Sequence, residues 1–186
     1  MRGSHASCAR LTDETRSRLF REVVMPHLDD AFVFARWLTG NPTDAEDVVQ
    51  DACLRALNGI ERYSGGNARA WLFSIVRNTT FTWLAHNRPK TLVLTDDLEG
   101  AARDAPTVSE SPTPEAEMIA QADEALLHTA IAALPAPFRE ALVMREFNGL
   151  SYREIASIVD IPVGTVMSRL ARARALLIER IGKEMS

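Results

Sequence analysis

The chain has 186 residues, of which 46% are hydrophobic, and a formal net charge of −4 at pH 7, which argues against a protein that simply coats DNA. Its length allows one medium domain or two small ones, and no apolar run approaches the roughly 20 residues of a membrane-spanning helix. Cys8 and Cys53 stand apart and match neither a disulfide framework nor a zinc-ligand spacing, which favours a reducing cytoplasm.

The first ten residues are not expected to belong to a folded domain. Residues 1–10 open with MRGSH and lack the apolar core of a signal peptide, so they are interpreted as an expression-tag remnant or disordered start. Beyond them, apolar residues at spacings of three and four predict one helix over Leu11–Arg36. His27 lies on its apolar side, where a partly buried histidine is far commoner than a metal ligand. Gly40 and Pro42 predict the end of this helix.

The next predicted helix, Thr43–Glu61, is the most clearly specified in the chain. Thr43 and Glu46 have the spacing of a capping box at its start. One face is an apolar stripe that includes Cys53, which is therefore interpreted as a small core residue. The opposite face is polar, and it is either a solvated surface or a docking surface for another protein. Its residues are Asp47, Gln50, Asp51, Arg55 and Asn58.

A loop with two glycines, Tyr63–Asn67, separates this helix from a third one over Ala68–His86, which Asn67 is placed to cap. One stripe of the third helix is apolar, and a second stripe interleaves aromatic residues with arginine. Such a stripe suits single-stranded nucleic acid, because bases stack on rings while arginine meets phosphate. The alternative is that each aromatic residue belongs to the core. The second stripe and its flanks comprise Arg69, Phe73, Arg77, Asn78, Phe81 and Trp83.

The stretch Thr91–Met118 marks a boundary between two domains. It contains seven acidic residues, one arginine and three prolines, with little periodicity. Such a composition predicts a flexible linker that repels itself. The sequence therefore predicts a first domain over residues 11–90, an acidic linker over 91–118 and a second domain over 119–183.

The second domain is predicted to contain four helices, of which the first two cover Ile119–Leu134 and Phe138–Phe147. A capping box of Ser151 and Glu154 then predicts the start of a short helix. Asp160-Ile161-Pro162 breaks that helix, and a second one begins at about Pro162. No alternation typical of strands persists anywhere, so the predicted fold class is all-α: two small helical domains joined by a flexible linker.

The last two predicted helices have the pattern of a helix-turn-helix. The second helix buries one stripe and presents polar residues on the opposite face, with Arg174 beside them. In this motif the second helix enters the DNA major groove, where arginine pairs with guanine. A helical hairpin with a solvated basic face is the alternative. The polar residues are Thr165, Ser168, Arg169 and Arg172.

Three stretches, taken together and in this order, resemble the extracytoplasmic-function (ECF) sigma factors of bacterial RNA polymerase. TDAEDVVQDACLRAL is similar to their core-polymerase-binding helix, and ARAWLFSIVRNTTFTWL to their −10 and melting helix. LPAPFREALVMREFNGLSYREIASIVDIPVGTVMSRLARAR is similar to their −35-binding domain. The resemblance covers roughly two thirds of the chain. It implies that residues 11–90 form sigma region 2 and residues 119–183 form sigma region 4.

The resemblance also implies a role for each set of polar residues. Asp47, Gln50, Asp51 and Arg55 would meet the clamp helices of the largest polymerase subunit. The loop and third helix would hold the −10 DNA and a flipped, melted base through Tyr63, Ser64, Asn67, Phe73, Arg77 and Asn78. Thr165, Ser168, Arg169 and Arg172 would lie on the −35 element. Met167 departs from the family, whose members often carry Lys or Arg there.

The function implied by the resemblance is that of a specificity subunit, not an enzyme. The chain would recruit core polymerase, read promoter DNA and hold the melted strand in the cytoplasm, under the control of an anti-sigma factor. No cofactor, metal, catalytic residue or membrane insertion is expected. Only polymerase would set the separation of the two domains. The alternative is a helix-turn-helix transcription regulator with an N-terminal sensing or dimerisation domain, which would not co-purify with core polymerase.

Overall fold

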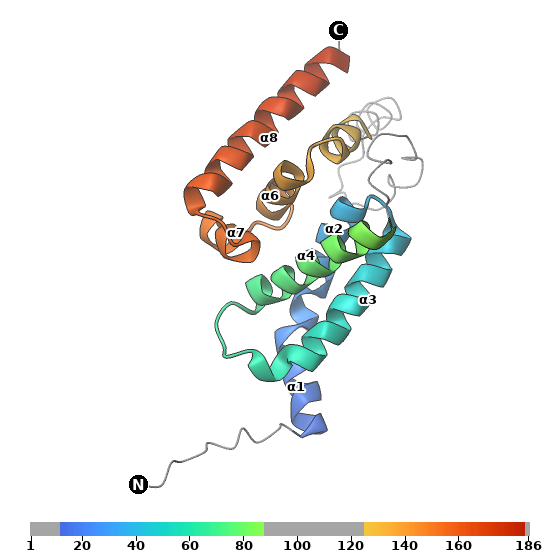
Figure 1. Ribbon diagram of the computed structural model, residues 1–186, viewed down its shortest axis with the longest axis vertical. Helices are drawn as coiled ribbons and strands as arrows, with labels where there is room; N and C mark the ends of the chain where they lie inside the picture. Colours follow the sequence, from blue (N-terminus) through green and yellow to red (C-terminus); the bar gives the residue numbers. More distant parts are fainter. Residues whose placement is uncertain (1–11, 88–124, 185–186) are drawn as a thin grey trace, which may run out of the picture.

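The computed structural model describes residues 12–87 and 125–184, and all regular elements in these two ranges are helices, which confirms the all-α prediction (Figure 1). The predicted disordered start and acidic linker lie outside the described residues. The α-helices are α1 (Asp13–Val23), α2 (Leu28–Thr39), α3 (Pro42–Gly59), α4 (Ala68–Asn87), an unlabelled helix described over 125–132, α6 (Ala136–Glu146), α7 (Tyr152–Val159) and α8 (Val163–Glu184). Two 3₁₀ turns, Met25–His27 and Ile60–Arg62, join neighbouring helices.

The predicted single helix over Leu11–Arg36 is wrong, because the chain breaks at the 3₁₀ turn Met25–His27. Pro26 lies in this turn. Proline has no backbone N–H and its ring clashes with the carbonyl four residues earlier, so the α-helical ladder ends before it. The chain continues as α2, which ends at Gly40 with a φ of 81°. Periodicity alone did not reveal the break, since the apolar spacing continues through it.

The predicted capping box of Thr43 and Glu46 is also wrong. The N-cap of α3 is Asn41, whose side chain accepts a hydrogen bond of 2.9 Å from the amide of Asp44. A residue before proline prefers extended backbone angles, and Asn41 has φ −146° and ψ 147°. Pro42 therefore places Asn41 in the conformation that an N-cap requires and occupies the first turn itself.

The core of the first part lies between α2, α3 and α4, which contact one another in pairs. Phe34 of α2 and Phe73 of α4 are fully buried and their rings stack with centroids 5.2 Å apart. Cys53 of α3 is half-buried, and burial raises the pKa of its thiol. Its thiol therefore stays protonated at neutral pH, as fits a packing residue.

The second part confirms the helix-turn-helix. Ser151 and Glu154 form both hydrogen bonds of the capping box at the start of α7. Asp160 then takes the left-handed conformation, with φ 59°, which Asp and Asn adopt more readily than most residues. This turn aims α8 so that its buried stripe packs against α6 and α7. The stripe comprises Val166, Leu170 and Ala173.

The two parts contact each other, and the expectation that only polymerase sets their separation does not hold for the arrangement seen here. α6 packs against α2, and α7 packs against α4. In Figure 1 the orange helices α6 and α7 accordingly lie above the green helix α4. None of the helices in the two described ranges is both long and apolar enough to cross a bilayer.

A pH-dependent contribution to stability is expected from Glu154. The Ser151 side chain and then the Ser151 amide, both hydrogen-bonded to it, lower the pKa of its carboxyl below the ordinary 4.5. Since the folded pKa is the lower one, the contribution is present above pH 4.5 and disappears as the pH falls through the folded value. Denaturant unfolding between neutral and acidic pH should show less loss of stability in Glu154→Gln than in the unmodified chain. The difference should stay below the roughly 1 kcal/mol of a full helix cap, because the carboxyl is largely hydrated.

Ser151→Ala serves as the matched variant, because it removes the principal hydrogen bond that lowers the Glu154 pKa and leaves the carboxyl in place. It should lose part of the same pH-dependent contribution. Identical pH profiles for Glu154→Gln and the unmodified chain would show that this carboxyl does not couple protonation to folding.

Candidate protein and nucleic-acid interfaces

The outward face of α3 combines charge with an exposed apolar residue. Asp47, Gln50 and Arg55 are exposed on this face, and Asp51 is partly exposed. The Arg55 guanidinium donates to Asp51 Oδ2 at 3.0 Å, an i,i+4 pair that orders both side chains. Leu54 is 61% exposed between them. The sequence prediction missed Leu54, although a leucine outside the buried stripe of this helix could have indicated it. An apolar centre with a charged rim is typical of a protein interface.

The loop before α4 is held by its own hydrogen bonds. The Tyr63 hydroxyl donates to the carbonyl of Gly66 at 2.7 Å, and Gly65 and Gly66 have φ values of 90° and 96°. The Tyr63 ring also packs against Trp71 with centroids 5.3 Å apart. Asn67 caps α4 as predicted, accepting from the amide of Ala70 at 3.0 Å. Ser64, Gly65 and Gly66 are exposed, so the loop presents a fixed backbone with little side-chain cover.

Phe73, which the resemblance places at the −10 DNA, lies in the core of this structure. Phe73 is fully buried and stacks on Phe34, so it has no face left for a base, and the core alternative holds. Neighbouring positions of α4 differ: Asn78 is exposed, and Phe81 is partly exposed with the Arg77 guanidinium 4.9 Å from its ring centre. Helical periodicity had placed Phe73 on the same stripe as Arg77, but it could not tell which neighbouring helix covers that stripe.

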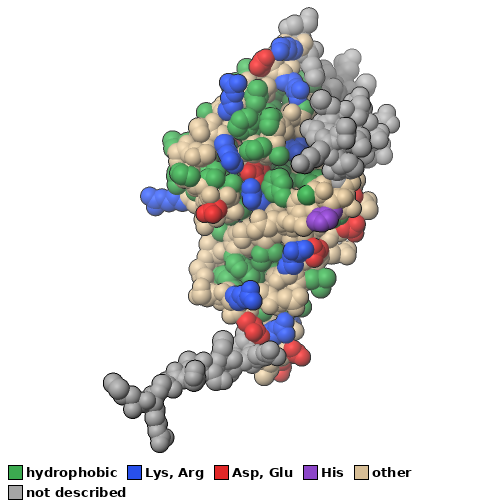
Figure 2. All heavy atoms as spheres, in the orientation of Figure 1, with side chains coloured by type: hydrophobic (Ala, Val, Ile, Leu, Met, Phe, Trp, Pro, Cys, Tyr) green, Lys and Arg blue, Asp and Glu red, His purple; other side chains and the backbone are tan. Residues whose placement is uncertain are grey.

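The polar face of α8 is largely open. Ser168 and Arg172 are exposed, Thr165 is partly exposed, and the Ser168 hydroxyl donates to the Thr165 carbonyl at 2.9 Å. Met167 is 53% exposed beside them. In the view of Figure 2, Lys and Arg side chains are interspersed with hydrophobic ones over the upper part of the molecule, where the C-terminal helices lie. A helix with exposed hydroxyl and guanidinium groups after a tight turn is the arrangement that reads the major groove.

Two of the predicted DNA-binding residues share one buried carboxylate. Glu140 of α6 is only 1% exposed. Arg77 donates to it through Nε at 2.7 Å and through Nη2 at 3.2 Å, and Arg169 donates through Nη1 at 3.2 Å. The side chains of Arg77 and Arg169 are therefore only 21% and 23% exposed. Glu140 was not foreseen, because it lies 63 residues from Arg77 and 29 from Arg169 in the sequence.

Further polar contacts join the two parts around this carboxylate. Arg69 pairs with Asp30 at 2.8 Å and also donates to the carbonyl of Asn148. The Asn148 side chain donates back to the Asp30 carbonyl at 3.1 Å. Asn67, the cap of α4, donates to Glu154, which closes the capping box of α7. The loop before α4 and the start of the helix-turn-helix are therefore directly linked.

An aromatic contact completes the boundary between the parts. Trp37 of α2 stacks on His128 with ring centroids 4.4 Å apart. It also packs against Phe147, with centroids 4.7 Å apart and the rings tilted by 51°. Phe147 is nevertheless 44% exposed, because its other face borders an apolar groove.

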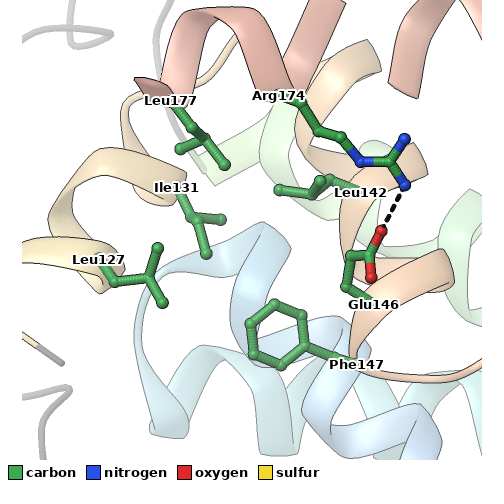
Figure 3. A pocket seen from close by; sticks show the side chains of 7 residues that line it. All are labelled: Leu127, Ile131, Leu142, Glu146, Phe147, Arg174 and Leu177. Atoms are coloured by element: carbon green, nitrogen blue, oxygen red, sulfur yellow. Dashed lines mark hydrogen bonds and ion pairs between the residues drawn. The ribbon is translucent and has the colours of Figure 1, made fainter. Parts of the chain in front are cut away.

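The groove lies between the helix over 125–132, α6 and α8, and encloses about 380 Å³ (Figure 3). Its side chains are mostly aliphatic, and Arg174 pairs with Glu146 at its rim at 2.7 Å. Among the described residues, no group of three or more His, Cys, Asp or Glu side chains is placed to hold a metal ion. The groove is lined by Leu127, Ile131, Leu142, Glu146, Phe147, Arg174 and Leu177.

Comparison with known proteins matches both parts of the chain. Residues 23–89 match the family described as Sigma-70 region 2, and residues 124–177 match Sigma-70, region 4. The chain is 37% identical over 156 residues to the ECF RNA polymerase sigma-E factor of Haemophilus influenzae, covering 81% of this chain and 80% of that protein.

Two solved structures are also similar. The sigma factor RpoE in complex with the anti-sigma factor NepR, from Bartonella quintana, matches with a TM-score of 0.65 and 27% identity over 88% of this chain and 96% of that one. CnrH in complex with the cytosolic domain of CnrY matches with a TM-score of 0.62 and 25% identity over 90% of each chain.

Proposed function

Because this chain belongs to the ECF RNA polymerase sigma factors, we propose that its three exposed surfaces divide the work of transcription initiation among polymerase, −10 DNA and −35 DNA. The family is one of transcription initiation factors, which bind core polymerase and promoter DNA. The proposal is supported by three surfaces that follow one another along the chain. They are the charged and apolar face of α3, the hydrogen-bonded loop before α4 and the polar face of α8. The proposed domains are residues 11–90 and 119–183, which contain the two matched regions.

The α3 face is the proposed contact with core polymerase. Asp47, Gln50, Asp51 and Arg55 would meet the clamp helices of the largest subunit, with Leu54 at the centre of the contact. Supporting this assignment, Asp51 and Arg55 pair with each other on the exposed side of α3, so both charges lie on the face that a partner would meet. An apolar residue surrounded by charges also follows the layout of known interfaces.

The loop over Tyr63–Asn67 and the exposed side of α4 are the proposed site for the melted −10 strand. Base flipping costs a few kcal/mol and requires a pre-formed pocket to offset that cost. The hydrogen bond from Tyr63 to Gly66 and the capping bond from Asn67 supply such rigidity. Ser64 and Asn78 are exposed for contacts with DNA, and Arg77 would reach phosphate once its pair with Glu140 opens.

The polar face of α8 is the proposed −35 contact, through Thr165, Ser168, Arg169 and Arg172. Ser168 and Arg172 are already exposed, whereas Arg169 must first leave Glu140. Met167 supplies no charge to a phosphate, so −35 binding should rely on these four residues.

Control by an anti-sigma factor is also proposed, with the apolar groove of Figure 3 as the surface that receives an amphipathic helix of that partner. The similar sigma factor from Bartonella quintana was solved with an anti-sigma factor. A groove of this size, apolar within and with an ion pair at its rim, suits the apolar face of a helix. The protein would act in the cytoplasm, where core polymerase is found.

Leu127→Glu should release the chain from this control. Leu127 is 39% exposed in the groove, so a carboxylate there would be desolvated on binding. The affinity for the anti-sigma factor should therefore fall by about tenfold or more. Transcription of the chain's own target genes in uninduced cells should rise. Ile178→Glu is the control, because Ile178 is 74% exposed on α8 and does not line the groove. Equal effects of the two variants would show that the groove is not the surface that binds the anti-sigma factor.

Reconstituted transcription tests the proposed function as a whole. The purified chain and core polymerase, with no other factor, should initiate at discrete promoters on genomic DNA, mapped by the ends of the transcripts. A helix-turn-helix regulator is the competing function. It would leave core polymerase inactive and bind a palindromic operator as the free protein.

A further inference from the structure

The exposed side of α8 has an apolar edge as well as polar residues. Val163 and Met167 lie in the first two turns of the helix and are 38% and 53% exposed. Residues four apart share a side of an α-helix, so these two side chains form one apolar strip. The strip takes no part in the core, because the buried stripe of this helix consists of Val166, Leu170 and Ala173.

Small residues run along the middle of the exposed side of α8, next to the apolar strip. Gly164, Ser168 and Ala171 are all exposed, and their spacing of four and three places them in one line along the helix. A side chain added at Gly164 would meet nothing outside its own turn of helix within 4 Å, so the space there is open. A helix with such a line of small residues can lie deep in a groove as wide as the DNA major groove. The longer side chains at its edges then reach the floor of the groove.

The apolar strip borders a positively charged hollow. Val163 lines this hollow together with Arg145 of α6 and with Tyr152 and Arg153 of α7. Arg145 donates to the Leu150 carbonyl at 3.0 Å and lies 5.0 Å from the centre of the Tyr152 ring, and neither contact cancels its charge. Among the described residues, the ion pairs include neither Arg145 nor Arg153. An apolar strip beside two uncompensated cations suits DNA, which is a polyanion with apolar groups on some of its bases.

The base edges in the major groove offer one apolar group, the C5-methyl of thymine. The other groups there are hydrogen-bond donors and acceptors, and cytosine has no methyl at this carbon. In a helix-turn-helix, the N-terminal residues of the second helix lie near the base edges, and Met167 lies in the second turn of α8. Methionine is unbranched and has three rotatable bonds, so its thioether can adapt to the position of a methyl group.

We propose that Met167 recognises a thymine of the −35 element by packing its side chain against the C5-methyl group, with Val163 completing the apolar contact. The polar residues of α8 supply the hydrogen bonds and charges of −35 binding, and Met167 adds a preference for one base. This contact rests on the proposed function, which assigns α8 to the −35 element. It adds the base and the chemical group that are recognised.

Replacing thymidine by deoxyuridine tests this contact, because deoxyuridine lacks only the methyl group. Core polymerase reconstituted with the full chain first selects its preferred −35 sequence from a promoter library randomised in that element. Each thymine of the selected element, on either strand, is then replaced singly by deoxyuridine, and the affinity of the holoenzyme for the promoter fragment is measured by competition. One replacement should lower the affinity about fourfold, which is the effect expected for one buried methyl group.

Three variants of the chain show whether Met167 causes this effect. Met167→Ala should bind the thymine and deoxyuridine fragments equally well. Met167→Leu is the matched variant and should remain sensitive to the methyl group, because leucine keeps an apolar side chain of similar volume. Ile178→Ala is the control and should behave as the unmodified chain does. Ile178 is 74% exposed on the same helix but lies far beyond its first turns.

The same measurements give the results that would overturn the inference. Equal sensitivity of the unmodified chain and Met167→Ala to every deoxyuridine replacement would do so, and so would a selected −35 element with no invariant thymine. A weaker affinity of Met167→Ala for core polymerase without DNA would also overturn it, because the residue would then contact protein. A holoenzyme that selects no −35 sequence would refute both the proposed function and this inference. Selection that does not depend on Met167 would refute the inference alone.

Discussion

Replacing Asp47 and Asp51 together with lysine is expected to reduce transcription by core polymerase about a hundredfold or more. Each substitution turns an attractive charge contact into a repulsive one, and truncating one partner of a buried interfacial pair typically costs about 2–5 kcal/mol. Asp51→Lys also places a positive charge beside Arg55, where the native pair has its 3.0 Å bond. The measurements are binding of the variant to core polymerase by fluorescence anisotropy and run-off transcription from a promoter that the unmodified chain uses.

The control is Glu14→Lys with Glu22→Lys, which makes the same charge change on exposed residues of α1. It should preserve both binding and transcription within a few-fold, because neither residue lies on the α3 face. Unchanged transcription with the Asp47 and Asp51 variant, once circular dichroism shows it to be folded, would exclude this face as the polymerase contact. The family assignment does not depend on that result.

Phe73→Ala is expected to lower the free energy of unfolding by about 3–5 kcal/mol, the usual cost of removing a buried aromatic side chain. Phe73 is fully buried and stacks on Phe34 at 5.2 Å, so truncation leaves a cavity between α2 and α4. Such a loss is a large share of the stability of a small domain. The measurement is denaturant unfolding followed by tryptophan fluorescence, with Trp37, Trp71 and Trp83 all in the same part of the chain.

Phe81→Ala provides the comparison. Phe81 is on the same helix but only partly buried, with Arg77 over its ring, so its truncation should cost clearly less. A stable Phe73→Ala variant that binds core polymerase but fails to open promoter DNA would restore the role in DNA melting that the sequence predicted for Phe73. Loss of stability without a selective defect in melting would confirm it as a core residue.

The contact between the two parts of the chain should affect the results of these two substitutions differently. Charge reversal on the α3 face should reduce polymerase binding whether or not the two domains are in contact, because this face lies outside their boundary. Phe73 lies beneath that boundary, since α4 also carries Arg69 and Arg77. A destabilised α4 should therefore loosen both the first domain and its contact with the second.

Much of this protein could be predicted from short stretches of sequence. The capping box of Ser151 and Glu154, the turn at Asp160 and the cap at Asn67 were all predicted correctly. Each depends on residues within a few positions of one another, where backbone hydrogen bonding and steric limits act directly. The apolar stripe of α8 was likewise predicted, because apolar residues with a period of 3.6 indicate which side of a helix is buried.

Tertiary structure decided what each buried side packs against. Periodicity put Phe73 and Arg77 on one stripe of α4, and only the packing of α2 separated them into a core residue and a boundary residue. Glu140 looked like one more acid in a helix, and burial made it the partner of two distant arginines. Local sequence determines helices and caps because their bonds close over a few residues. Contacts between residues far apart in the chain depend on how whole helices pack, and no spacing in the sequence specifies that.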